Sequence, residues 1–165
     1  MTATETFQLD AKEFDALGIS LGAITKRLKD ATPMFDEIGA AMVSSTQFNF
    51  EAGQAPDGTP WKPSERVETF GGQTLVNKGH LRDSLTHEAS PDQVSVGSNL
   101  VYAGIHNFGG EIRPKNGKAL RFGGGNNTRI VAKVTMPQRQ YLGVGTGDEE
   151  EIGAIVQDYL TGGLN

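Results

Sequence analysis

The sequence contains no cysteine among its 165 residues. It therefore has no disulfide framework, no thiolate nucleophile and no cysteine metal ligand. It also lacks an apolar run near the roughly 20 residues that a membrane span needs. Its first five residues have neither the basic start nor the apolar stretch of a secretory signal. These absences predict a protein without a membrane partner, and the lack of cysteine fits a reducing compartment such as the cytoplasm.

Chemical motifs are equally scarce. The three histidines, His80, His87 and His106, form no H-x-x-x-H pair and no cluster with aspartate, as a zinc site would require. The strained elbow G-x-S-x-G of serine hydrolases is absent. The glycine run 123–125 is not followed by Gly-Lys-Ser/Thr, so a nucleotide-binding loop is not expected. We therefore predict no catalytic residue, no metal and no cofactor.

What the chain does contain is acid and glycine. Its net charge is −5, from 20 acidic and 15 basic residues, which disfavours sequence-independent binding to phosphate. There are 22 glycines, well above the usual share of about 7%. So much glycine predicts many tight turns and long loops.

Apolar periodicity predicts three helices. The first begins at Asp10, the second at Thr32-Pro33 with Thr32 as its cap, and the third at Asp148, where acidic residues suit the positive end of a helix dipole. The second helix should end near Phe50. Their apolar stripes are Phe14, Leu17, Leu21, Ile24 and Leu28; Phe35, Ile38, Met42, Ser45 and Phe48; and Ile152, Ile155, Val156, Tyr159 and Leu160.

Strand patterns lie between the second and third helices. Residues 81–88 and 93–97 predict a hairpin that turns at Pro91-Asp92, with Val94 and Val96 on one face. Residues 120–122 and 130–134 predict another hairpin, with glycines and asparagines at its tip.

These elements together predict an α+β fold. A small antiparallel sheet would be packed by the N-terminal helices and a C-terminal helix, within a single domain over residues 1–165. Residues 1–9 would form a flexible arm. Residues 64–79 and 115–128 would be long loops, which favour binding or assembly.

Residues 102–110 form a corner that can be interpreted as a site or as packing. A short helix is expected there, begun by an Asn99 cap and ended by Gly109 or Gly110. His106 lies between two aromatic residues, Tyr102 and Phe108. It could act as a general base, but we expect its ring to pack at the corner and its nitrogens to bond to backbone.

Three further residues accompany this corner. Trp61, flanked by prolines, is predicted to fill the core beside a helix end; the alternative is a stacking platform for a ligand. Arg139 could pair with a carboxylate of its own chain or of a neighbour. Tyr141 lies two residues later in the segment that returns from the second hairpin.

Four blocks, in order, resemble the phage virion morphogenesis (tail completion) family of tailed bacteriophages and Mu-like prophages. The resemblance covers about residues 35–160, and the family more often has phenylalanine where Tyr141 stands. The blocks are Pro56-Asp57-Gly58-x-x-Trp61-x-Pro63; Gly79-x-Leu81-x-x-Ser84; Val94-x-Val96-Gly97-x-Asn99-x-x-Tyr102-Ala103-x-x-His106-x-Phe108-Gly109-Gly110; and Pro137-x-Arg139-x-Tyr141-Leu142-Gly143.

The resemblance implies a structural protein of the head–tail junction, assembled in the host cytoplasm and located at the tail or neck of the virion. Such proteins complete the tail, form rings that are most often sixfold, and enable head–tail joining. The implied partners are other copies of the chain, the tail tube protein and the head–tail connector proteins. DNA would pass through an acidic lumen without specific binding, and the eight residues named above would serve assembly or structure.

A second hypothesis belongs to another class. The chain could be a small ligand-binding domain or a hydrolase that uses His106 in a pocket formed with Tyr102 and Phe108. The burial and the hydrogen bonds of His106 in the fold bear on the choice between the two hypotheses.

Overall fold

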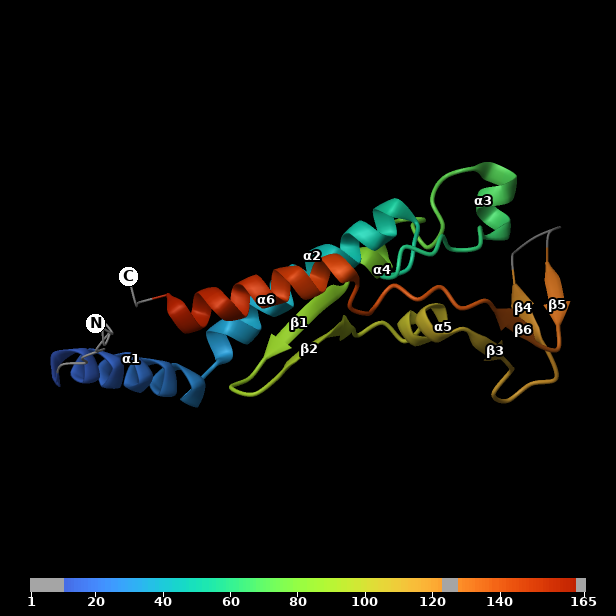
Figure 1. Ribbon diagram of the computed structural model, residues 1–165. Coiled ribbons are helices and arrows are strands. Elements are labelled where there is room, and N and C mark those ends of the chain that lie inside the picture. The colour runs from blue at the N-terminus through green and yellow to red at the C-terminus, as the bar shows by residue number, and fades with distance from the viewer. Residues whose placement is uncertain (1–10, 123–127, 163–165) are drawn as a thin grey trace, which may run out of the picture.

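A computed structural model describes residues 11–122 and 128–162 and has an α+β fold, as predicted. The expected flexible arm at residues 1–9 and most of the expected hairpin tip lie outside these ranges. Six helices and six strands are described (Figure 1): α1 Ala11–Lys29, α2 Thr32–Ala52, α3 Glu65–Phe70, α4 His80–Asp83, β1 Leu85–Ala89, β2 Val94–Ser98, α5 Ala103–Phe108, β3 Gly110–Ile112, β4 Leu120–Phe122, β5 Arg129–Val131, β6 Val134–Met136 and α6 Thr146–Thr161.

Helix α2 is the central element. It is covered by α6 and by the β1–β2 hairpin (Figure 1). One apolar cluster joins its first half to β2 and α6, and Val94 and Val96 contribute to that cluster from a shared face of β2, as predicted. Proline lies in the first turn of α2, but the N-cap is Ala31 rather than the predicted Thr32. The amide of Thr32 instead donates to the Asp30 carboxylate at 3.1 Å.

The buried face of α2 differs in part from the predicted stripe. Ile38 and Met42 are buried as expected, whereas Phe48 is 60% exposed. Thr46, Asn49 and Phe50 take the buried positions instead, because the segment of residues 137–143 packs against the C-terminal end of the helix. Gly39 lies against His87 of β1 so closely that an added Cβ would stand 2.4 Å from the imidazole Cδ2.

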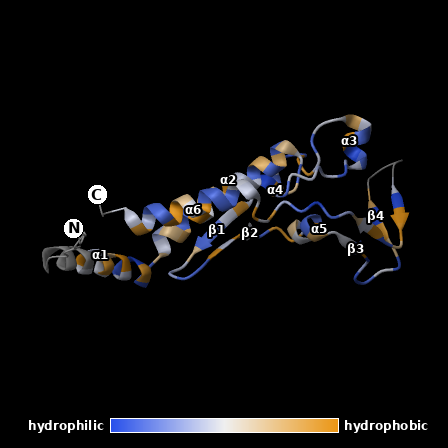
Figure 2. Cartoon of the chain, in the orientation of Figure 1, coloured by the Kyte–Doolittle hydropathy of each residue, from blue (hydrophilic) through white to orange (hydrophobic). Residues whose placement is uncertain are grey.

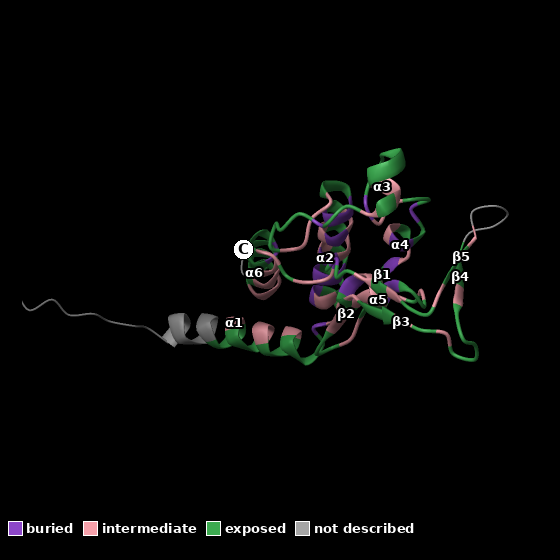
Figure 3. Ribbon diagram, turned by 90° about the vertical axis from the view of Figure 1, so that its right-hand side faces the viewer, coloured by how far each residue is buried: buried purple, intermediate pink, exposed green. Residues whose placement is uncertain are grey.

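Helix α1 does not pack on a sheet, contrary to prediction. It stands apart from the remaining structure (Figures 1 and 3), and its stripe residues Leu21 and Leu28 are exposed. Within the described residues, the hydrogen bonds that join α1 to other elements lie at its C-terminal end and lead to the C-terminal end of α6. Arg27 donates to the carbonyl oxygens of Tyr159 and Leu160 at 3.0 Å, and the Tyr159 hydroxyl donates to the Asp30 carbonyl at 2.9 Å.

The described strands form three separate two-stranded antiparallel ladders rather than one sheet. They pair β1 with β2, β3 with β6 and β4 with β5, so both predicted hairpins are present. The first strand begins at Leu85 rather than at residue 81, because residues 80–83 form α4, and Val134 belongs to β6 rather than to the second hairpin. The β4–β5 ladder lies at the far end of the molecule from α1, near α3 (Figure 1). Figure 2 shows apolar and polar residues on the same elements, for example along α6.

Two predicted loops contain regular structure. Helix α3 lies within residues 64–79, capped by Ser64, whose side chain accepts from the Val67 amide. Strand β4 lies within residues 115–128. No described helix is both long and apolar enough to cross a bilayer.

Candidate functional site

The corner at residues 102–110 is held by residues 137–143, which we call the strap. The strap has no regular secondary structure and runs beside α5. The Arg139 amide donates to the His106 carbonyl at 2.9 Å. The amides of Tyr141 and Leu142 both donate to the Asn107 side-chain oxygen, at 2.9 and 3.0 Å. One buried asparagine therefore orders the backbone of the strap.

Tyr141 carries the strap into the core. Its side chain is 1% exposed, and its hydroxyl donates to the Ala103 carbonyl at 3.0 Å. Its ring lies 4.9 Å from that of Phe50, which meets Trp61 edge-on at 5.5 Å. The Trp61 indole donates to the Gln140 carbonyl at 2.8 Å. Trp61 thus fills the core beside the end of α2, as predicted, and burial raises the pKa of the Tyr141 phenol.

Gly109 permits the close approach of α5 to the strap. Helix α5 ends at this glycine, as expected, with a φ of 68°. A Cβ there would stand 2.7 Å from the Gln138 amide nitrogen, in a backbone conformation that L side chains rarely adopt. The predicted Asn99 cap is wrong: the N-cap is Tyr102, and no side chain bonds to the free amides.

Arg139 does not pair with a carboxylate within the described part of its chain. It is 5% exposed, and its Nε and Nη2 donate to the carbonyl oxygens of Lys62 and Pro63 at 2.8 and 3.2 Å. Burial lowers the pKa of its guanidinium. The strap is thereby fixed to the segment that carries Trp61.

His106 packs at the corner, but within the described residues its ring nitrogens make no hydrogen bond to backbone, contrary to expectation. Its Nδ1 is buried and has no hydrogen-bond partner within the described residues. Its ring meets that of Tyr102 edge-on at 6.0 Å. Burial lowers the pKa of the imidazole, and the charge of Arg139 lowers it further, so the neutral form is favoured.

The remaining corner residues face outward. Phe108 is 73% exposed and Tyr102 is 43% exposed, so the predicted aromatic pair does not enclose the imidazole. Gly110 begins β3 with a φ of 134°. Of the eight predicted residues, Trp61, Arg139 and Tyr141 are buried, His106 and Gly109 are half-buried, and Tyr102, Phe108 and Gly110 are exposed.

A cavity of about 380 Å3 opens beside the corner, and we call it the basic pocket. Five of its lining residues are basic, and none is aspartate or glutamate. The strap, α5 and the segment from Ser64 to Leu81 form its walls. The residues that line it are Ser64, Arg66, Leu75, Asn77, Lys78, Gly79, His80, Leu81, Tyr102, His106, Met136 and Arg139.

The sequence profile of the phage virion morphogenesis family matches residues 12–161. The chain belongs to this family. It is also 33% identical over 139 residues to "Mu-like prophage FluMu G protein 2" of Haemophilus influenzae, an alignment that covers 82% of this chain and 85% of the relative. No solved structure matches it significantly. The predicted family is thus confirmed, and with it a role in assembly of the phage virion.

The chemistry of the corner fits the structural role that this family name denotes. The imidazole of His106 has no carboxylate among the pocket residues to orient it, and no hydrogen bond joins it to Ser64 within the described residues. The part of the chain that the structure describes contains no group of three or more side chains placed to hold a metal ion. In this virion protein, the corner is held by packing and by hydrogen bonds between segments that are far apart in sequence.

Two residues that hold the corner in place are not among the residues predicted from the sequence. Asn107 holds the strap, and Phe50 joins both aromatic contacts. Asn107 lies within the block that carries the family resemblance, but an isolated asparagine has no pattern that predicts burial. Phe50 falls outside the predicted stripe of α2, because the aromatic cluster and not the helix period decides its position.

Proposed function

We propose that this chain is a structural protein of the head–tail junction that forms a closed ring at the end of the tail and enables head–tail joining. The proposal is carried by the match of residues 12–161, nearly all of the described chain, to the phage virion morphogenesis family. The relative named for a Mu-like prophage supports the same assignment. Its partners would be other copies in a ring, most simply six, the tail tube protein and the head–tail connector proteins.

The surface of the subunit supports assembly. Large apolar side chains are exposed on α1 and around the corner, among them Ile19, Val101 and Phe108. A single exposed apolar residue is ordinary, but contiguous groups at protein surfaces mark interaction sites. Ring closure requires heterologous contacts, in which two different faces of each copy meet.

The acidic balance of the chain supports a lumen through which DNA passes. A net charge of −5 repels the phosphate backbone and disfavours specific or lasting binding. On this proposal, which rests on the family match, the protein is located in the virion at the tail or neck, and DNA passes it without specific binding.

Electron microscopy of tails tests this function. Tails would be purified from cells that lack the chain, and then incubated with the purified protein and with DNA-filled heads. We expect added density at one end of each tail and the recovery of head–tail joining. Tails that join heads equally well without the protein would contradict the proposal.

A further inference from the structure

The basic pocket is unbalanced in charge. Three cationic residues, Arg66, Lys78 and Arg139, line it beside His80 and the neutral imidazole of His106, and no carboxylate does. Positive groups gathered in one cavity repel one another and are costly to desolvate unless an anion is present. The pocket therefore has the composition of an anion receptor.

The base of the pocket is already shaped for a planar anion. Arg139 is almost fully buried, and its Nε and Nη2 are fixed by two backbone carbonyls. Its Nη1 has no hydrogen-bond partner in the described ranges. The Nδ1 of His106, also in the pocket wall, is buried and unpartnered. Guanidinium donors held in this way suit a carboxylate, which accepts hydrogen bonds at two oxygens.

The rim of the pocket is open and charged. Lys78 and His80 are exposed, and no described ion pair engages either of them. The rim also bears the partly exposed ring of Tyr102. An acidic protein segment could therefore be bound by both charge and apolar contact, which a small inorganic anion could not.

This chain carries an acidic segment that lacks partners. Glu149, Glu150 and Glu151 are consecutive and exposed at the start of α6, and none joins an ion pair in the part of the chain that the structure describes. Some other acids do join ion pairs, since Asp83 pairs with Arg82 and Glu111 pairs with Arg113. The start of α6 is thus complementary in charge to the basic pocket.

An exposed aromatic residue accompanies this acidic segment. Phe48 and Glu151 line the same surface recess, between α2 and the start of α6. Aromatic anchors beside charged groups are typical of the residues that dominate protein–protein interfaces. The acidic segment therefore resembles one side of an interface rather than a solvated helix end.

The two complementary surfaces lie on different flanks of the molecule. Figure 3 shows α6 on one side of α2 and α4, which carries the pocket residue His80, on the other. A contact between them therefore requires two copies. Because each copy would use a different face, the contact is heterologous and can propagate into a ring.

We propose that the basic pocket of each copy receives the acidic start of α6, Glu149–Glu151, of the next copy. This inference rests on the ring function proposed above and names the contact that builds the ring. Arg139 and His106 form its buried base, and Lys78 and His80 form its rim. Phe48 of the incoming copy lies beside the contact.

Charge reversal tests the contact. One variant carries Lys78→Glu, and a second carries Glu149→Lys with Glu150→Lys. All three positions are exposed, so the fold should survive, which circular dichroism and thermal unfolding would verify. Sedimentation velocity at low salt would measure assembly. We expect each variant alone to associate at least roughly tenfold more weakly than the wild type, as for close charge pairs at other interfaces.

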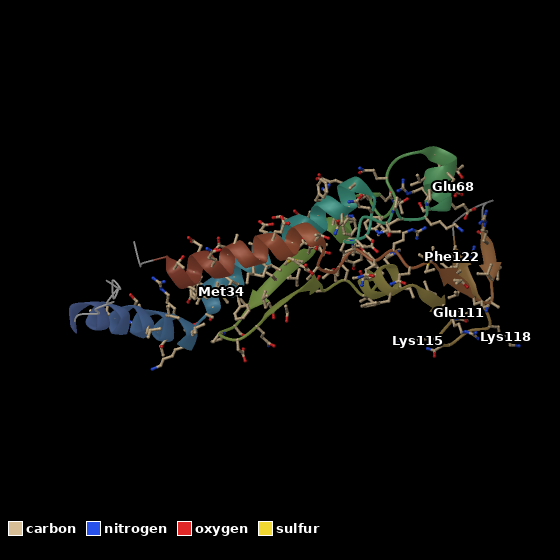
Figure 4. All side chains as sticks on the ribbon, in the orientation of Figure 1. Met34, Glu68, Glu111, Lys115, Lys118 and Phe122 are labelled. Carbon is tan, nitrogen blue, oxygen red and sulfur yellow. The ribbon has the colours of Figure 1, made fainter. Side chains whose placement is uncertain are left out.

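Mixing the two variants supplies the decisive measurement. Each copy of one then offers the surface that the other needs, so an equimolar mixture should form rings of alternating copies. Combining all three substitutions in one chain should restore assembly as well. Lys115→Glu is the matched control, because Lys115 lies on the loop after β3, at the end of the molecule away from α6 (Figure 4), and it should assemble like the wild type.

The outcomes separate the contact from the function. If the wild type forms rings and either charge-reversed variant alone does so equally well, the proposed contact is wrong, but the ring function is not contradicted. Loss of assembly in the Lys115→Glu control, or failure of the mixture to recover, would also overturn the contact. A wild type that stays monomeric, alone and on tails, would overturn the ring function itself.

Discussion

The Tyr141 hydroxyl links the strap to the first turn of α5 from inside the core. It donates to the Ala103 carbonyl at 3.0 Å, in a site from which water is excluded. At the scale of single residues, this bond and the Asn107 side chain satisfy backbone groups that have no partner in a helix or strand, as helix caps do. They give fixed partners to a segment that has no regular hydrogen-bond ladder of its own.

Tyr141→Phe should lower the free energy of unfolding by about 0.5–1.5 kcal/mol, the usual net contribution of one such hydrogen bond. The aromatic contacts with Phe50 would remain. Urea denaturation would measure the change. Tyr102→Phe is the matched control, because no hydrogen bond of the Tyr102 hydroxyl is found within the described residues, and it should change stability little. Equal losses in both variants would contradict the assigned role.

His106 should make the stability of the unassembled subunit fall as the pH is lowered. Its pKa in the fold is below the ordinary value of 6.5, because of burial and then the charge of Arg139. Above pH 6.5 both folded and unfolded chains carry a neutral imidazole. Below it the unfolded chain binds the proton first, so unfolding becomes easier until the folded pKa is reached.

His106→Gln should remove that contribution. Urea denaturation of wild type and variant at pH 7 and pH 5.5 would show it as a difference between the two pH dependences. Carboxylates with lowered pKa values, such as Glu111, lose their contribution at lower pH and are common to both proteins. Identical pH dependence of the two proteins over this interval would contradict the assignment.

At the scale of elements, close packing of α2 on β1 depends on Gly39. A Cβ added at residue 39 would stand 2.4 Å from the Cδ2 and 2.9 Å from the Cβ of His87. Gly39→Ala should therefore destabilise the fold by about 1–3 kcal/mol, the usual cost of overpacking, despite the better helix propensity of alanine.

Gly153→Ala supplies the matched control for this prediction. Gly153 is also in the middle of a helix, α6, but an added Cβ there meets nothing within 4 Å. Alanine should stabilise the protein at this position by up to about 1 kcal/mol. The midpoint temperature of thermal unfolding should therefore fall for Gly39→Ala and rise for Gly153→Ala. A rise in both variants would show that helix propensity outweighs the contact with β1.

The elements that could be predicted from sequence are those whose own residues carry a pattern. The alternation of Val94 and Val96 predicts β2, and the period of α6 predicts its apolar stripe, because each element packs one partly buried face against the cluster on α2. Helix α3 carries no such stripe, since none of its residues is buried, and only the Ser64 cap and early glutamates mark it. The sequence therefore predicts a loop at these residues.

The candidate site was only partly predictable, for a related reason. Its glycines and aromatics stand out in sequence, but their partners do not. Arg139 is bound by carbonyls of residues 62 and 63, and Tyr141 by the side chain of Asn107. Such contacts are set by the tertiary arrangement of distant segments, which no local period encodes.

At the scale of the whole molecule, the subunit leaves several surfaces unpaired. Among the described residues, α1 is hydrogen-bonded to the rest of the fold near its C-terminal end, no carboxylate lines the basic pocket, and no ion pair engages the acidic start of α6. A chain of the phage virion morphogenesis family that leaves such surfaces open is expected to complete them by association. The prediction of a ring itself comes from the family resemblance, and these surfaces are compatible with it.

The mass of the purified particle tests the ring most directly. Native mass spectrometry and sedimentation would be applied to the full chain, alone and bound to purified tails. We expect a closed assembly, of about 106 kDa if it contains six copies of the 17.6 kDa chain. A strict monomer in both settings would contradict the account.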